Sequence, residues 1–193
     1  ATVVGIPPME DAYIARATER IFLTPIKLTM LPELTNMNIP DAGVAHNLTL
    51  VSFDKTFSGQ AQKIMSSMWG AGQMMFNKML IAFDSDTNIA DYKQAAVKMS
   101  ENVDPAHDIS FIKGPLDVLD HSSTKFAFGS KMGIDASKKY KEELIHESPD
   151  NLNIKDISIN IDDIRSNFPE ITEINNRLLK EGISVVLISI IKS

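Results

Sequence analysis

One apolar run decides the predicted fold: Asn77-Lys78-Met79-Leu80-Ile81-Ala82-Phe83. The run has the length of a strand and ends in an acidic turn, Asp84-Ser85-Asp86. On either side of it in the sequence, residues 59–74 and 89–102 have the apolar spacing of helices. The first of these predicted helices is weakened by two glycines near its end. The run is therefore predicted to be a strand that lies between two helices in the chain.

The same alternation of strands and helices extends toward both ends of the sequence. Residues 46–53 and 109–112 are predicted strands, and residues 9–23 are a predicted amphipathic helix with a proline just past its end that kinks or restarts it. Met132-Gly133-Ile134-Asp135 fits either a further short strand or a loop fixed by glycine. Strands that alternate with helices at this spacing are typical of α/β proteins. The sequence thus predicts a layered α-β-α sandwich with a mixed sheet over residues 1–140.

The C-terminal part, residues 141–193, is predicted to be an extension or a subunit contact. Its first segment, residues 141–160, is polar and reads as a connector. A helix is expected over Pro169–Lys180, because proline favours the first turn of a helix and Gly182 follows the predicted end. A final strand is expected over Ile183–Ile191.

The composition is that of a globular protein and excludes several classes of function. Hydrophobic residues make up 44% of the chain, which is enough for a sizeable core. Lys and Arg number 19 against 25 Asp and Glu, and no Lys/Arg-rich run occurs, so no nucleic-acid partner is expected. The absence of cysteine excludes disulfides, zinc–thiolate sites and a cysteine nucleophile. The longest apolar stretch falls far short of the roughly 20 residues of a membrane-spanning helix, and a cytoplasmic location is expected.

Two short segments, Asp104–Asp108 and Asp117–His121, place carboxylates beside a histidine. Neither has the spacing of a metal site, and such clusters are usually turn and cap residues. The acidic segment 84–88 matches the first positions of a calcium loop, but Ile89 stands where that loop requires glycine. All three segments are predicted to be turns.

Glycines and methionines supply the remaining candidates. Gly129-Ser130-Lys131-Met132-Gly133 lacks the spacing of a nucleotide-binding loop, but its lysine and backbone N–H groups leave an anion site open. Five methionines between residues 65 and 79 surround Trp69 and indicate core and subunit contact more than a cofactor site. No motif in the sequence supplies a catalytic centre.

Several stretches, in a fixed order over about residues 2–140, together resemble the C-terminal part of the UbiD family of decarboxylases. They are Gly5-Ile6-Pro7-Pro8-Met9-Glu10-Asp11-Ala12-Tyr13, Ala17-Thr18-Glu19-Arg20-Ile21-Phe22-Leu23, His46-Asn47-Leu48, Gly59-Gln60-Ala61-Gln62-Lys63-Ile64-Met65, Met68-Trp69-Gly70, Asn102-Val103-Asp104-Pro105-Ala106, Gly114-Pro115-Leu116-Asp117-Val118-Leu119-Asp120-His121 and Gly129-Ser130-Lys131-Met132-Gly133-Ile134-Asp135-Ala136-Ser137-Lys138-Lys139. The last stretch is the most specific. Within the family, which includes 3-octaprenyl-4-hydroxybenzoate carboxy-lyase, the chain is most similar to the menaquinone-type branch.

The resemblance implies a non-oxidative, reversible decarboxylation of an aromatic or unsaturated acid in quinone biosynthesis. It implies prenylated FMN, a divalent metal (Mn or Mg) and potassium as cofactors. In that family the flavin, the metal and the catalytic residues belong to the part that precedes this segment. The strand-like start at residues 2–6 fits a chain cut from a longer protein. We therefore expect no catalytic, cofactor-binding or metal-binding residue in this chain, and no activity of the chain alone.

The resemblance also implies partners and substrate-facing residues. The partners are the missing N-terminal flavin-binding part, an aromatic acid and further copies of the chain, with peripheral membrane association through a lipophilic substrate as a further expectation. Pro115 and Leu116 are expected to face the substrate, as are Met132 and Lys131, the latter as an anion contact. The alternative is structural: Pro115 and Leu116 seal the core, and the nearby glycines permit a tight turn.

The sequence departs from the family pattern at His107, at Gln60 and at Tyr140-Lys141-Glu142-Glu143, which leaves the identity of the substrate open. The competing interpretation of the whole protein is an α/β binding or assembly module without catalysis.

Overall fold

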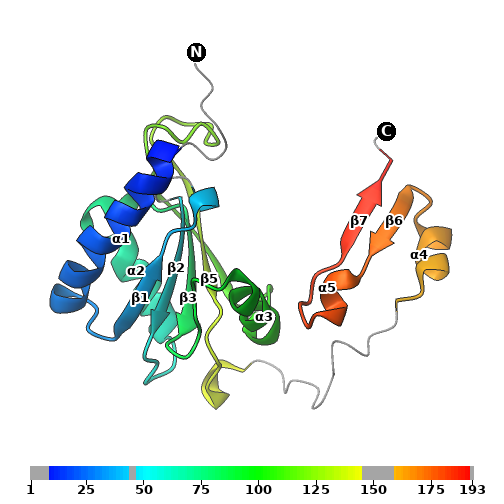
Figure 1. The fold of residues 1–193 in the computed structure, drawn as a ribbon, viewed down its shortest axis with the longest axis horizontal. Coiled ribbons are helices and arrows are strands. Elements are labelled where there is room, and N and C mark those ends of the chain that lie inside the picture. The colour runs from blue at the N-terminus through cyan, green and yellow to red at the C-terminus, as the bar shows by residue number, and fades with distance from the viewer. Residues whose placement is uncertain (1–8, 44–46, 145–158, 192–193) are drawn as a thin grey trace.

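The structure, a computed structural model, describes residues 9–43, 47–144 and 159–191 and contains one large and one small β-sheet (Figure 1). The large sheet consists of β1 (Leu34–Asn38), β2 (Leu48–Phe53), β3 (Met79–Asp84), β4 (Ile109–Pro115) and β5 (Phe128–Asp135), in the order β1-β2-β3-β5-β4. The three inner strands are parallel to one another, and each edge strand is antiparallel to its neighbour. The mixed sheet predicted from the sequence is confirmed.

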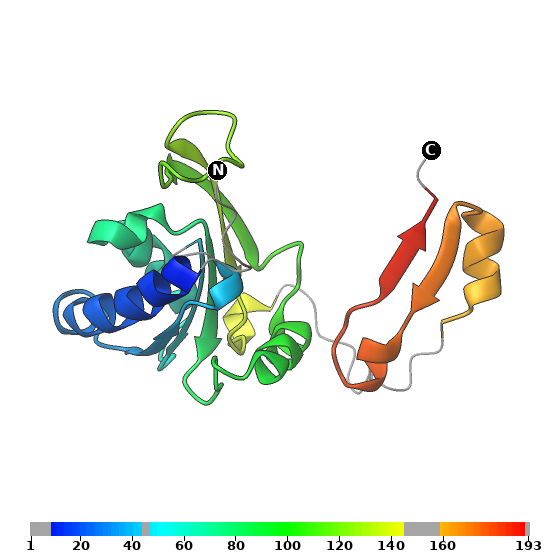
Figure 2. The same cartoon turned by 45° about the horizontal axis from the view of Figure 1, so that its top comes forward.

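Helices cover both faces of this sheet. Figures 1 and 2 show α1 (Met9–Thr29) and α2 (Gln60–Trp69) on one side and α3 (Tyr92–Asn102) on the other. Side chains alternate between the two faces along a strand. In β3, Leu80 and Ala82 accordingly join the core under α1 and α2, whereas Ile81 and Phe83 join the core under α3. The central run is apolar at successive positions because both of its faces are buried, and the α-β-α sandwich is confirmed.

One glycine allows α2 to lie close to the sheet. Gly133 of β5 faces α2, and a Cβ atom at this position would lie 2.9 Å from Cη2 of Trp69 and would overlap Sδ of Met65. Only a residue without a side chain leaves room for that contact. The methionines around Trp69 therefore fill the core, as their sequence pattern indicates.

Several element boundaries differ from the predicted ones. α1 continues through Pro25 to Thr29 without restarting. The predicted helix 59–74 divides into α2, which ends at Trp69 with Gly70 as its C-cap, and a 3-10 helix, Gly72–Phe76; the extended backbone of Ala71 separates the two. The segment 132–135 is the end of the much longer β5, and β2 begins at Leu48, residue 46 lying outside the described residues. β1 was not predicted, because its sequence Leu-Thr-Asn-Met-Asn is too polar to read as a strand.

The predicted C-terminal helix over 169–180 is wrong. The described residues there form β6 (Ile171–Asn175) and the short α5 (Arg177–Lys180), preceded by α4 (Ile161–Asn167). Ile171, Thr172 and Ile174 are β-branched and favour a strand, which pairs with β7 (Leu187–Ile190) in a two-stranded sheet. The final strand is thus confirmed over four of its expected residues.

Two polar contacts join this C-terminal part to α3. Lys93 forms an ion pair of 2.9 Å with Glu181, and Oγ of Ser100 lies 3.4 Å from the carbonyl oxygen of Gly182. The division into parts at residue 140 remains a prediction.

Candidate ligand-binding site

The candidate site lies on the α3 side of the sheet, where the strands extend past the core under that helix. Residues that pair across neighbouring strands point to the same face. The pairs Leu48–Met79, Met79–Met132 and Phe111–Met132 therefore form one apolar row across four strands. The row lines a pocket of about 550 Å³ together with Gly43, Asn47, Lys78, Ser130 and Lys131. Phe111, at the edge of the sheet, is 71% exposed, so the row is open to a ligand at that end.

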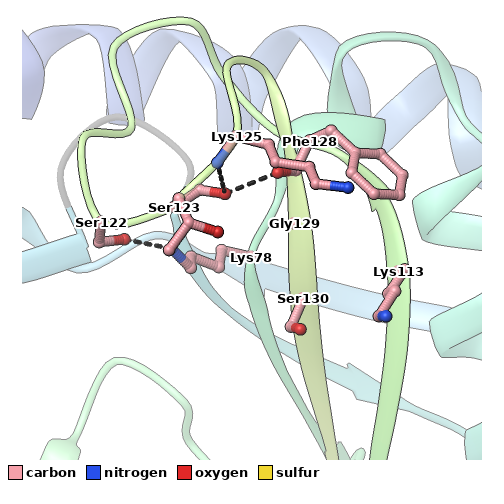
Figure 3. A pocket seen from close by; sticks show the side chains of 9 residues that line it. Lys78, Lys113, Ser122, Ser123, Lys125, Phe128, Gly129 and Ser130 are labelled. Carbon is pink, nitrogen blue, oxygen red and sulfur yellow. Dashed lines mark hydrogen bonds between the residues drawn. The ribbon is translucent and has the colours of Figure 1, made fainter.

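A second pocket, of about 400 Å³, is polar and positively charged (Figure 3). Its lining residues are Lys78, Lys113, Ser122, Ser123, Thr124, Lys125, Phe128, Gly129 and Ser130. The three lysines come from three different places: the start of β3, the end of β4, and the loop that joins β4 to β5. The lining contains hydroxyl groups but no carboxylate. Both pockets are lined by Lys78 and Ser130, so the cationic pocket adjoins the apolar one.

Lys78 is held in place by a buried carboxylate. Its ammonium group lies 2.7 Å from Oδ2 of Asp120 and also donates to Oγ of Ser122. Burial alone would raise the pKa of Asp120, but the hydrogen bonds from Lys78 and Ser122 outweigh it and lower the pKa to about 2. Asp120 is therefore ionised at neutral pH and balances the charge of Lys78.

The loop between β4 and β5 is fixed by local hydrogen bonds, and it extends beyond the sandwich in Figure 2. Oδ1 of Asp117 accepts from the backbone N–H of Leu119 at 2.8 Å, and Oγ of Ser123 donates to the carbonyl oxygen of Phe128 at 2.6 Å. Ala127 adopts a left-handed conformation, φ +53°, at the turn back into β5. The acidic residues of this segment are turn residues, as predicted.

The four residues predicted to face the substrate lie in different environments. Pro115 is exposed at the end of β4, opposite Phe128 of the cationic pocket. Leu116 is only 1% exposed and packs beneath the hairpin, which matches the structural alternative. Met132 is half-buried in the apolar row. The structure thus brings Met132 and Pro115 to the two pockets but leaves Leu116 in the core.

Lys131 is placed differently from the expected anion contact. Its side chain is 2% exposed, and its ammonium group donates to the carbonyl oxygens of Met75 at 2.5 Å and Asn77 at 2.7 Å. No carboxylate pairs with it among the described residues. Burial, together with the nearby charge of Lys78, lowers the pKa of Lys131 to about 8. The group ties β5 to the 3-10 helix, and its role as an anion contact stays a prediction.

The low pKa of Lys131 predicts an unusual pH dependence of stability. Between pH 8 and 10.5 the unfolded chain keeps a proton that the folded chain has released, so the contribution of Lys131 to the free energy of unfolding rises with pH. Compared with Lys131→Met, the wild-type chain should gain up to about 3 kcal/mol over this range in urea unfolding. Lys138→Met is the control, because hydrogen bonding to Asp86 raises the pKa of Lys138, so its contribution stays constant up to about pH 10.5 and falls only above that pH. If the free energy of unfolding of the wild type, relative to that of Lys131→Met, stayed flat or fell with pH, the lowered pKa of Lys131 would be contradicted.

The described residues do not fit a metal ion. No group of three or more histidines and carboxylates that could hold one occurs in the part of the chain that the structure describes. Asp104 accepts from the N–H of Ala106 at 2.9 Å, and Oδ2 of Asp84 accepts from the N–H of Lys138, so these acids serve turns and loops. Neither pocket is lined by the first turn of an α-helix, a place where phosphate groups commonly bind.

Among the described helices, none is long and apolar enough to cross a membrane.

Lys78, Lys113 and Lys125 were not predicted as site residues. They stand far apart in the sequence, and only the pairing of β4 with β5 brings Lys113 opposite Ser130. The one available signal was the lysine that directly precedes Gly114-Pro115.

The comparisons with known proteins identify the family. Residues 12–136 match the sequence profile of the 3-octaprenyl-4-hydroxybenzoate carboxy-lyase C-terminal domain, and the chain belongs to this UbiD family of decarboxylases. It is 44% identical over 144 residues to an uncharacterized protein of Archaeoglobus fulgidus, and 44% identical over 142 residues to one of Aquifex aeolicus. These matches cover 74% of this chain but only 30% and 29% of the two relatives. The chain thus spans less than a third of the length of either protein.

Solved structures show the same fold at low sequence identity. Vanillic acid decarboxylase of Sedimentibacter hydroxybenzoicus, in its closed form, matches with a TM-score of 0.67 and 22% identity, over 86% of this chain and 34% of that one. The UbiD-class enzyme HmfF of Pelotomaculum thermopropionicum, in complex with FMN, matches with a TM-score of 0.58 and 22% identity, over 78% of this chain and 32% of that one. The α/β sandwich is therefore the fold of the corresponding part of UbiD-class enzymes.

Proposed function

We propose that this chain is the C-terminal domain of a longer cytoplasmic carboxy-lyase that removes CO₂ from an aromatic acid in quinone biosynthesis, without oxidation. The observation that carries the proposal is the family match over residues 12–136, together with a sandwich fold shared with vanillic acid decarboxylase and with a UbiD-class enzyme. The chain spans about 30% of its relatives, which leaves room for a flavin-binding part elsewhere in the protein.

In this proposal the reaction takes place outside the chain. Prenylated FMN, with a divalent metal and potassium, would be held by the missing part and would supply the electron sink that decarboxylation requires. The role of the present domain is to close the cleft over the substrate with its apolar row and with Pro115.

The proposal includes self-association of the domain. Tyr13, Ile21 and Leu28 of α1 are 69%, 61% and 80% exposed. Their spacing, about two helical turns from one to the next, places them on the same side of the helix. Exposed apolar residues that gather in this way commonly form protein interfaces. They support a homo-oligomer, and they equally suit the competing function, an assembly module without catalysis.

Assay of the longer protein distinguishes the two functions. The gene that encodes this chain is expressed in full together with a flavin prenyltransferase, and the purified protein is incubated with hydroxybenzoic acids. Release of CO₂ that depends on the prenyltransferase is the expected result. A protein that assembles normally but releases no CO₂ from any of the acids would favour the assembly module.

A further inference from the structure

The cationic pocket carries charge that the described residues do not balance. Asp120 pairs with Lys78, but neither Lys113 nor Lys125 forms an ion pair with a carboxylate within the described part of the chain. Lys125 lies 5.9 Å from the centre of the Phe128 ring, a weak cation–π contact. The chain as a whole has a net charge of −6, so a pocket with three lysines and no lining carboxylate is not a consequence of composition.

The pocket also offers neutral hydrogen-bond donors. The hydroxyl groups of Thr124 and Ser130 line it beside the lysines, whereas the hydroxyl of Ser122 already donates to Asp120. Charge-assisted hydrogen bonds from ammonium groups, supplemented by hydroxyl donors, are the usual means of binding carboxylate and phosphate groups. Ser123 and Asp120 fix the loop that carries these donors, so the pocket is formed before a ligand arrives.

The adjoining apolar pocket suits a ligand that has an anionic group at one end and an apolar body at the other. Leu48, Met79, Met132 and Phe111 form a row across four strands beside the shared residues Lys78 and Ser130, and the row ends with Phe111 at the edge of the sheet. Methionine side chains adapt to apolar groups of varied shape. A ligand that placed its anionic group among the lysines would lay an attached hydrocarbon body along this row.

We propose that the chain binds an amphipathic organic anion, with its carboxylate or phosphate group at Lys113 and Lys125 and its apolar body on the row formed by Leu48, Met79, Met132 and Phe111. The inference concerns binding by this chain alone and does not depend on the proposed decarboxylase activity.

Calorimetric titration of the 193-residue chain with four small probes tests the proposal. Octyl phosphate and octanoate carry both an anionic group and a hydrocarbon chain, inorganic phosphate carries only the anion, and octyl glucoside carries only the chain. Octyl phosphate or octanoate should bind at least tenfold more tightly than either single-feature probe. The tighter of the two assigns the anionic group as phosphate or carboxylate. Equal binding of octyl glucoside would overturn the proposal, because the apolar row alone would then account for binding.

Variants locate the site. The double variant Lys113→Gln with Lys125→Gln should weaken binding of the preferred probe by about a hundredfold, about tenfold for each charge-assisted contact. Lys141→Gln with Lys180→Gln removes the same charge from exposed lysines outside both pockets and should leave binding unchanged. Phe111→Ala should weaken octyl phosphate several-fold and leave inorganic phosphate unaffected. If both double variants lost the same affinity, binding would be only a general charge effect and the proposed site would be wrong.

Discussion

Replacing Phe83 with alanine is expected to lower the free energy of unfolding by about 3–5 kcal/mol. Phe83 is fully buried in β3, in the core that α3 covers with Ala95 and Met99. Removing its ring leaves a cavity between the sheet and α3 that close-packed neighbours can fill only in part. Urea unfolding followed by circular dichroism measures the loss.

Phe111→Ala is the matched control for this prediction. It deletes the same ring from a strand of the same sheet, but at a position that is 71% exposed and lies beyond the core under α3. Its free energy of unfolding should stay within about 0.5 kcal/mol of the wild-type value. If the two variants were equally destabilised, the division of this face into a covered core and an open apolar row would be incorrect.

Replacing Lys55 with methionine should also be strongly destabilising, by about 3 kcal/mol or more. The ammonium group lies 2.7 Å from Oε2 of Glu143, 3.0 Å from Oγ of Ser137 and 2.8 Å from the carbonyl oxygen of Lys138. The side chains of Lys55 and Glu143 are only 5% and 13% exposed. The contact connects the loop before α2 to the segment that follows β5, and its loss leaves a partly buried carboxylate without its cation.

The pKa of Glu143 provides a second readout. Burial would raise this pKa, but hydrogen bonds from the N–H of Gly59 and from Lys55 outweigh burial and lower it. A carboxyl with a lowered pKa contributes stability above its unfolded value, near 4.5, and loses it as the pH falls through the folded value. Lys55→Met should therefore reduce the acid sensitivity of unfolding below pH 4.5 as well as the stability at pH 7.

Lys138→Met is the control for Lys55. Lys138 forms an ion pair of the same type, 2.9 Å from Asp86, but both side chains are more than half exposed. Exposed pairs of this kind contribute little to stability, because solvent screens them, so Lys138→Met should change the free energy of unfolding much less than Lys55→Met. If the two substitutions lowered the free energy of unfolding equally, the burial of the Lys55–Glu143 ion pair would not make it more stabilising than an exposed pair.

Much of the sandwich could be predicted because its strands carry strong local signals. The apolar residues 79–83 and the helical spacing around them indicate a covered strand whatever the rest of the chain does. β1 gave no such signal, since it is a polar edge strand that is stabilised by pairing with β2, with Thr35 and Ser52 in contact at 2.8 Å. The C-terminal helix was predicted wrongly because proline and glycine at its expected ends outweighed the β-branched residues between them.

The candidate site could be predicted only in part. Met132 and Pro115 were found through family resemblance, whereas the lysines of the cationic pocket are brought together by the register of β4 against β5. The alternation of side chains along a strand explains where Lys131 lies, because neighbouring residues of a strand point to opposite faces. Met132 points to the open row, so Lys131 must point toward the 3-10 helix.

We propose that this chain is part of a flavin-dependent decarboxylase but does not itself hold the flavin. The most direct test compares flavin content in two proteins purified from the same prenyltransferase-producing cells: the longer protein and the 193-residue chain. The longer protein should show flavin absorbance at close to one equivalent, and the chain should show none and should leave the fluorescence of added FMN unchanged. A 193-residue chain that carried flavin or quenched FMN fluorescence tightly, or a longer protein that carried no flavin, would contradict this proposal.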